Sequence, residues 1–183
     1  MAADFLFRDS LFRGSLFRGG LALAVVILVL DQISKWWILD VYDLPARGVV
    51  AVLPFLNFVM VWNPGVSFGL FPAESDGTRW FLVALTAAIA VAVVVWMRRA
   101  DTRLSATALA LVLGGAVGNI IDRVLYGAVA DFIQLHALGY AFYVFNIADA
   151  AISIGVALLL LDVILSGRDH IASPGGKHRR QDG

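Results

Sequence analysis

The chain has 183 residues, of which 60% are hydrophobic and 15% charged, and its formal net charge is zero. Soluble domains average roughly 45–50% apolar residues, so this composition indicates an integral membrane protein. The sequence contains no cysteine, which excludes disulfides, thiolate catalysis and cysteine metal ligands. Its three histidines, His136, His170 and His178, lack the four-residue spacing of a helical metal pair. We therefore expect neither a metal nor a cofactor.

The first twenty residues contain a five-residue repeat in which Leu-Phe-Arg is followed by two small or polar residues. The three copies begin at Leu6, Leu11 and Leu16. A period of five matches neither a helix nor a strand. We therefore expect residues 1–20 to form a separate cytoplasmic Arg/Phe-rich arm that rests on the anionic membrane surface.

Four apolar stretches approach the ~20 residues needed to cross a bilayer. They are Leu21–Leu39, Trp80–Trp96, Leu104–Ile121 and Ile147–Leu165. The first is too long for the apolar part of a cleavable signal peptide, no small-residue cleavage site follows it, and it contains Asp31 and Lys35. The sequence thus predicts a retained first span and a four-span membrane domain over residues 21–166.

Basic residues gather at one end of the four predicted spans. That side contains Arg8, Arg13, Arg18, Arg98, Arg99, Arg103, Arg168, Lys177, Arg179 and Arg180, and the other side contains Arg47, Arg79 and Arg123. Because positive residues are retained in the cytoplasm, we predict a multi-pass protein of the cell membrane with both termini cytoplasmic. The Gly-rich basic tail, 167–183, is predicted to be disordered.

Two longer segments connect the spans on the predicted extracytoplasmic side. Within residues 40–79, the stretch 55–62 is rich in β-branched and aromatic residues and too short to span, so we predict a strand or hairpin resting on the membrane surface. The second segment, 122–146, contains a cluster of aromatic residues, which usually anchor at the lipid headgroups. These aromatic residues are Tyr140, Phe142, Tyr143 and Phe145.

Polar residues suited to a site appear first in and after the first span. Asp31 and Lys35 are four residues apart and share a helical face, where they could neutralise each other in lipid or take a direct part in shaping a site. Asn63 and Gly65 follow in Asn-Pro-Gly, which is either an ordinary turn or an amide and a close-approach glycine at a site.

A second polar group lies at the end of the third span. Asn119, Asp122 and Arg123 are three or four residues apart and share a face. Asp122 and Arg123 could simply form an ion pair at the membrane interface. The preceding glycine-rich run, 114–118, has a small-xxx-small spacing that permits close helix packing.

Asp131 and Asp149 come last, each in apolar surroundings. A carboxylate at the centre of a spanning helix costs roughly 2.5–3.5 kcal/mol. Asp131 could be a helix cap or a loop acid. Asp149 could stand at the third position of a helix capped by Asn146, with Ser153 on the same face. If the two acids meet, they share a proton, so that one activates water and the other protonates the leaving amine. This is the chemistry of aspartic proteases, although sequence spacing alone does not bring the acids together.

Taken in order, these motifs resemble the bacterial lipoprotein signal peptidases, also called signal peptidase II. The matching motifs are Asp31-Gln32-x-x-Lys35, Asn63-x-Gly65-x-x-Phe68, Gly114-Gly115-x-x-Gly118-Asn119-x-x-Asp122-Arg123, Gly127-x-Val129-x-Asp131-Phe132 and Phe145-Asn146-x-Ala148-Asp149. Each is weak alone, but five in order across a four-span chain are specific. One variation is Val66-Ser67, where the family often has smaller residues.

The resemblance implies an α-helical integral membrane protein of four transmembrane helices, with a small extracytoplasmic β-cradle and a short extracytoplasmic helical loop. It implies removal of the signal peptide from diacylglyceryl-modified prolipoproteins, just before the lipidated cysteine, at the extracytoplasmic face. Lipidated prolipoproteins and membrane lipids would be the partners, and nucleic acid would not. Asp131 and Asp149 would be catalytic. The residues that would line or support the site are Asp31, Lys35, Asn63, Gly65, Asn119, Asp122, Arg123 and Asn146.

Two alternatives belong to other classes of protein. A small proton-coupled membrane transporter would use intramembrane acids as relay groups, with polar residues near the midplane and repeated halves. A non-catalytic membrane scaffold would tolerate Asp→Asn changes at both acids.

Overall fold

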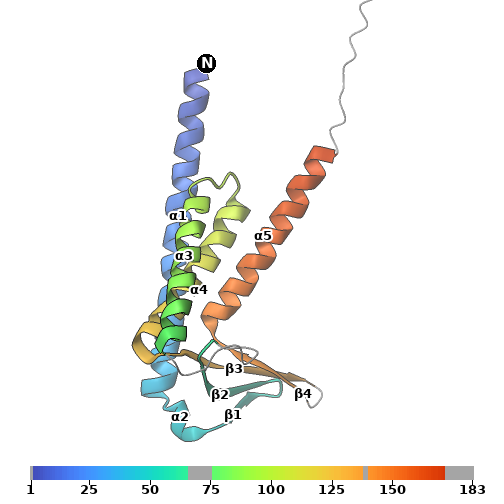
Figure 1. The fold of residues 1–183 in the computed structure, drawn as a ribbon. Coiled ribbons are helices and arrows are strands. Elements are labelled where there is room, and N and C mark those ends of the chain that lie inside the picture. Colours follow the sequence, from blue (N-terminus) through green and yellow to red (C-terminus); the bar gives the residue numbers. More distant parts are fainter. Residues whose placement is uncertain (1, 66–75, 138–139, 172–183) are drawn as a thin grey trace, which may run out of the picture.

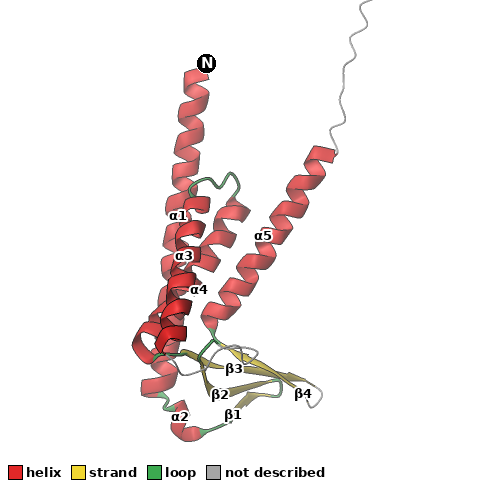
Figure 2. Cartoon of the chain, viewed as in Figure 1, coloured by secondary structure: helices red, strands yellow, loops and turns green. Residues whose placement is uncertain are grey.

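The computed structural model describes residues 2–65, 76–137 and 140–171, with side chains from residue 12 to 165. Long helices stand on one side of a small sheet, which lies at one end of the bundle (Figures 1 and 2). The elements are α1 (Ala2–Trp36), the π-helical turn η1 (Trp37–Val41), α2 (Leu44–Arg47), β1 (Val50–Leu53), β2 (Leu56–Asn63), α3 (Asp76–Met97), α4 (Arg103–Tyr126), β3 (Val129–Ala137), β4 (Tyr140–Phe145) and α5 (Ile147–Ile171).

Four helices in the described ranges are long and apolar enough to cross a membrane, which confirms the predicted four spans. They comprise Phe12–Val41, Asp76–Met97, Arg103–Tyr126 and Ile147–Leu165. The third helix runs further than predicted, so Asp122 and Arg123 lie within α4 and not in a connecting segment. It ends where Gly127 adopts the left-handed conformation, with φ of +83°.

The N-terminal repeat is helical, although its five-residue period predicted no regular element. The helix α1 runs unbroken from Ala2 to Trp36. Five residues rotate a helix by about 140° beyond one full turn, so the described arginines of the repeat, Arg13 and Arg18, leave α1 in different directions. Arg13 pairs with Asp101 at 2.7 Å, and the guanidinium of Arg98 lies 5.4 Å from the centre of the Phe17 ring. This part of α1 therefore packs against the link between α3 and α4.

The C-terminal helix also extends beyond the predicted boundary. α5 continues to Ile171, whereas the sequence placed the start of the tail at residue 167. The rest of that tail, from residue 172, lies outside the described residues, as do Val66, Ser67 and Phe68 of the second motif.

The helix α4 forms the centre of the bundle and packs against α1, α3 and α5. Its glycines allow backbones to approach closely. A Cβ added to Gly114 would lie 2.6 Å from the carbonyl oxygen of Ala24 in α1, and one added to Gly115 would collide with the carbonyl oxygen of Ala148 in α5. The small-xxx-small run thus packs two helices against α4, as its spacing predicted.

We expect Gly115→Ala to destabilise the protein by roughly 1–3 kcal/mol, because the added methyl meets the rigid backbone of α5. Unfolding in mixed micelles measures the change. Gly19→Ala in α1 is the matched control, since a Cβ there has nothing within 4 Å. Alanine favours a helix over glycine, so the control should unfold at the same or a higher denaturant concentration. Equal stability of the two variants would contradict the proposed packing.

The sheet is antiparallel, with strand order β1-β2-β3-β4. β2 confirms the strand predicted around residues 55–62, while β3 and β4 come from the second connecting segment. Pairing of β2 with β3 sets Asn63 opposite Val129 and Val61 opposite Asp131. A small core of Ile38, Leu44 and Phe132 packs the turn after α1 against the sheet. The sheet therefore carries Asp131 to the end of the bundle where α5 begins.

Candidate active site

Asp131 lies on β3 with only 1% of its surface exposed. Its Oδ1 accepts a hydrogen bond from Asn146 Nδ2 at 2.7 Å, and its Oδ2 accepts one from Asn63 Nδ2 at 3.0 Å. Burial is the main cause that raises the pKa of Asp131 to about 6; the hydrogen bond from Asn63 opposes this shift, and the charge of Asp149 adds to it. Asp131 therefore retains a proton to higher pH than an ordinary aspartate does.

Asp149 occupies the first turn of α5. Its backbone N–H donates to Asn146 Oδ1 at 2.9 Å, which confirms the predicted cap. Its side-chain Oδ1 accepts a hydrogen bond from Asn119 Nδ2 at 2.8 Å. Asp149 is half-buried, so its environment differs from that of the enclosed Asp131.

Two asparagine side chains connect the acids. Asn146 donates to Asp131, and the same Nδ2 lies 3.4 Å from Asn119 Oδ1. Asn119 in turn donates to Asp149. The structure thus brings two acids from different elements, a strand and a helix, to one hydrogen-bonded group in which their charges interact.

Beneath this group, Lys35 is buried between two carboxylates. Its Nζ lies 2.7 Å from Asp31 Oδ2 and 2.7 Å from Asp122 Oδ2, and it also contacts Asn119 Oδ1 at 3.5 Å. Gln32 Nε2 donates to both carboxylates at 3.1 Å. The ion pair expected between Asp31 and Lys35 is confirmed, and Asp122 joins this pair rather than forming an interfacial pair with its neighbour in the sequence.

The carboxylates that pair with Lys35 also hold the backbone beside the site acids. Asp31 Oδ1 accepts a hydrogen bond from the N–H of Ala148 at 2.9 Å, and Asp122 Oδ2 accepts one from the N–H of Ala130 at 3.1 Å. Ala148 and Ala130 each immediately precede one of the two site acids. Lys35 therefore ties together the two backbone segments that present these acids.

Gly65 and Arg123 complete the arrangement around Asn63. The N–H of Gly65 donates to Asn63 Oδ1 at 2.8 Å, and its φ of +80° favours glycine. A Cβ on Gly65 would lie 3.2 Å from Arg123 Nη2. Arg123 Nη1 donates to the carbonyl oxygen of Asn119 at 3.3 Å, and its buried Nε has no hydrogen-bond partner among the described residues. The guanidinium thus borders the turn and the asparagine that contacts Asp149.

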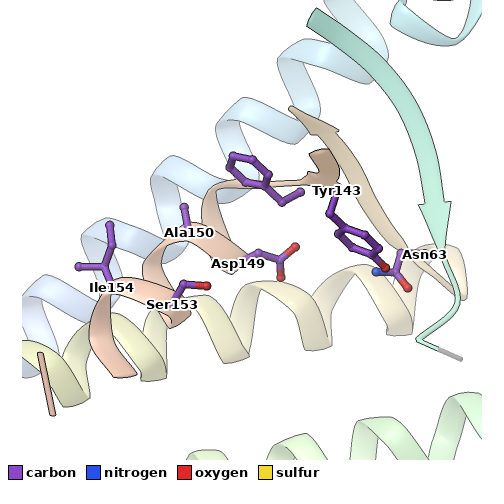
Figure 3. Close-up of a pocket in the computed structure, with 7 residues that line it drawn as sticks. Asn63, Tyr143, Asp149, Ala150, Ser153 and Ile154 are labelled. Atoms are coloured by element: carbon purple, nitrogen blue, oxygen red, sulfur yellow. The ribbon is translucent and has the colours of Figure 1, made fainter. Parts of the chain in front are cut away.

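A cavity of about 520 Å³ opens beside Asp149, between the sheet and α5. Asp149 and Ser153 line it from one face of α5, as the sequence predicted, whereas Asn146 is buried behind it. Figure 3 shows these side chains with Tyr143 and Asn63 across the space from α5. The lining consists of Asn63, Tyr143, Phe145, Asp149, Ala150, Ser153 and Ile154. Its mainly apolar walls surround one carboxylate.

All ten site residues predicted from the sequence are connected through hydrogen bonds and ion pairs in the structure. The bridging role of Gln32 was not predicted, although a polar amide beside Asp31 in an apolar span was a usable signal. The hydrogen bonds from the backbone N–H groups of Ala130 and Ala148 were not predictable, because side-chain types give no signal for them. Tyr143 was expected at the headgroups and lines the cavity.

The chain is similar to known proteins over most of its length. A family model described as Signal peptidase (SPase) II matches residues 23–165. A lipoprotein signal peptidase of Methylobacterium sp. (strain 4-46) is 52% identical over 146 residues, covering 80% of this chain and 88% of the relative. Another, of Beijerinckia indica subsp. indica, is 48% identical over 151 residues, covering 82% and 90%.

Two solved structures of bacterial membrane enzymes have a similar fold. One superposes with a TM-score of 0.70 at 29% identity, covering 90% of this chain and 94% of the other. The second has a TM-score of 0.69 at 32% identity, covering 79% and 92%. Together with the four apolar helices, this likeness defines the class: a membrane enzyme that crosses the bilayer several times. The chain belongs to the signal peptidase II family.

Proposed function

We propose that this protein removes the signal peptide from diacylglyceryl-modified prolipoproteins, cutting just before the lipidated cysteine. Its family and the names of its relatives support this activity. The observation that carries the proposal is the pair Asp131 and Asp149, whose charges interact and whose side chains are joined through two asparagines beside an open, mainly apolar cavity.

In the proposed mechanism the two acids share one proton. Asp149, which lines the cavity, takes a proton from water as the water oxygen attacks the scissile carbonyl carbon. Asp131, whose pKa is raised to about 6, holds the shared proton and polarises the carbonyl oxygen. When the C–N bond breaks, a carboxyl proton passes to the amine. The water has then supplied one hydroxyl and one proton, and the pair returns to a single shared proton.

We infer that the site faces the extracytoplasmic side of the bacterial cytoplasmic membrane. The acids lie at the end of the bundle where the sheet packs, and the link between α3 and α4, which carries Arg98, Arg99 and Arg103 at its ends, lies at the opposite end (Figure 1). A proton-coupled transporter would instead be expected to place its polar groups near the midplane. The gathering of the polar residues at one end therefore favours a protease.

Cleavage of purified precursors tests the proposed function. We expect the protein to cut a diacylglyceryl-modified precursor before its modified cysteine and to leave the unmodified precursor intact, with the new termini identified by mass spectrometry. Cleavage elsewhere, or equal cleavage of both precursors, would contradict the proposed substrate class.

The hydrogen bond from Asn63 makes a testable contribution to the pH dependence. This bond stabilises the ionised form of Asp131, so Asn63→Ala should raise its pKa further, by roughly one unit. The shared proton would then be retained to higher pH. We therefore expect the alkaline limb of the pH profile of kcat/KM, which reports the free enzyme, to move upward.

The matched control is Asn57→Ala, also on β2, where the side chain bonds Gln134 and not a site acid. Its alkaline limb should coincide with that of the parent protein. An unmoved or lowered limb in Asn63→Ala would show that Asp131 does not hold the shared proton.

A further inference from the structure

A second cavity, of about 310 Å³, lies at the end of the bundle opposite the sheet, between α1 and the start of α4. One wall comes from the N-terminal repeat, including Ser15, Leu16 and Gly19. A Cβ added to Gly19 would meet nothing within 4 Å, so the glycine leaves open space. The repeat, which has no part in the candidate active site, thus helps to form a separate hollow.

The cavity combines apolar walls with one cation and two hydroxyl groups. Leu16 and Leu23 contribute apolar surface from α1, whereas Arg103, Thr107 and Ser15 contribute polar groups. The side chain of Arg103 is exposed, and its guanidinium makes no hydrogen bond or ion pair with any described residue. Its guanidinium is therefore available to an anion, unlike that of Arg13, which pairs with Asp101.

The position of Arg103 at the end of a span indicates which kind of anion it would meet. Arg103 is the first residue of the span Arg103–Tyr126, so its charge lies where the chain leaves the bilayer. Lipid phosphates lie at this depth, and each basic residue there gains about 1 kcal/mol from anionic lipid. The surrounding region is positive, with five arginines and two aspartates. These are Arg13, Arg18, Arg98, Arg99, Arg103, Asp101 and Asp162.

We propose that this cavity binds an anionic phospholipid. The phosphate contacts Arg103 and the hydroxyls of Ser15 and Thr107, and an acyl chain lies along the apolar face from Leu16 to Leu23. The site is independent of the proposed peptidase activity, because it lies at the other end of the helices.

Lipid titration of the full chain tests the site. Thermal unfolding in detergent micelles is measured with increasing phosphatidylglycerol, phosphatidylcholine or inorganic phosphate. We expect phosphatidylglycerol to raise the unfolding temperature at the lowest concentration. Arg103→Gln should increase the half-maximal phosphatidylglycerol concentration roughly fivefold, the equivalent of one interfacial charge. Gly19→Leu should fill the cavity and have at least the same effect.

Two controls separate a defined site from general surface charge and from helix propensity. Arg99→Gln removes an exposed arginine of the same link that does not line the cavity. Gly14→Leu adds the same side chain in α1 at a position with open space outside the cavity. Arg99→Gln should weaken the response clearly less than Arg103→Gln does, because Arg99 attracts anionic lipid only from outside the cavity, and Gly14→Leu should keep the parent response.

The proposal fails if phosphatidylcholine stabilises as well as phosphatidylglycerol, or if inorganic phosphate alone gives the full effect. It also fails if Arg99→Gln weakens the response as much as Arg103→Gln, or if Gly19→Leu leaves the response unchanged. None of these outcomes bears on precursor cleavage, so the two proposals are tested separately.

Discussion

Asp131→Asn and Asp149→Asn should each lower the cleavage rate of a lipidated precursor by at least roughly 10²–10⁴-fold, the range that general acid–base groups contribute. An amide at either position neither accepts a proton from water nor donates one to the leaving amine. Single-turnover cleavage, followed by mass spectrometry, measures the loss. The double variant should be no slower than the slower single variant, because the two acids act as one unit.

The matched control is Asp43→Asn, an exposed aspartate near the sheet with φ of 51°, a conformation that asparagine tolerates. It should cleave at the parent rate. Unfolding curves for the four variants and the parent protein separate a loss of catalysis from a loss of folding. Full activity in either site variant would refute the proposed dyad.

The second large effect concerns stability. Lys35→Met should destabilise the fold by about 3–5 kcal/mol, because it leaves Asp31 and Asp122 buried without their shared cation. Methionine has a similar length and fills the same space, so the change in the free energy of unfolding comes mainly from the lost charge. Unfolding in mixed micelles measures the change.

Two further variants serve as controls for Lys35→Met. Arg13→Met breaks the pair with Asp101, whose side chains are 41% and 66% exposed, and should cost at most about 1 kcal/mol. Adding Asp122→Asn to Lys35→Met should restore part of the stability, since one unpaired carboxylate is removed. If Lys35→Met and Arg13→Met lowered the free energy of unfolding equally, the role assigned to Lys35 would be contradicted.

The parts of the fold that depend on local sequence were predictable. Apolar length identified the four spans, and the spacing of Asn146 and Asp149 identified a capped helix start. Four-residue spacing likewise predicted the pairing of Asp31 with Lys35. In each case the interacting groups lie within one helix or at its end, so periodicity alone is informative.

The parts that depend on distant contacts were not predictable from spacing. Asn63 reaches Asp131 because β2 pairs with β3, a register set by tertiary packing. Lys35 reaches Asp122 because α1 packs on α4. The helical conformation of the N-terminal repeat was not predicted from its five-residue period, which fits no regular element. The repeat is continuous with the apolar first span, so the helix of that span extends through it.

The two site acids lie on opposite sides of a span boundary. Asp149 lies in the first turn of α5, within the 19-residue apolar span Ile147–Leu165, whereas Asp131 belongs to a sheet outside the spans. Helices in a bilayer of unsuitable thickness change tilt, while a sheet at the surface feels no such force. We therefore expect the separation of the acids to depend on the length of the surrounding acyl chains, and we expect Lys35, which pairs with the carboxylates that hold both backbone segments, to oppose that change. If the two acids carry out the proposed cleavage, its rate should vary with the thickness of the membrane.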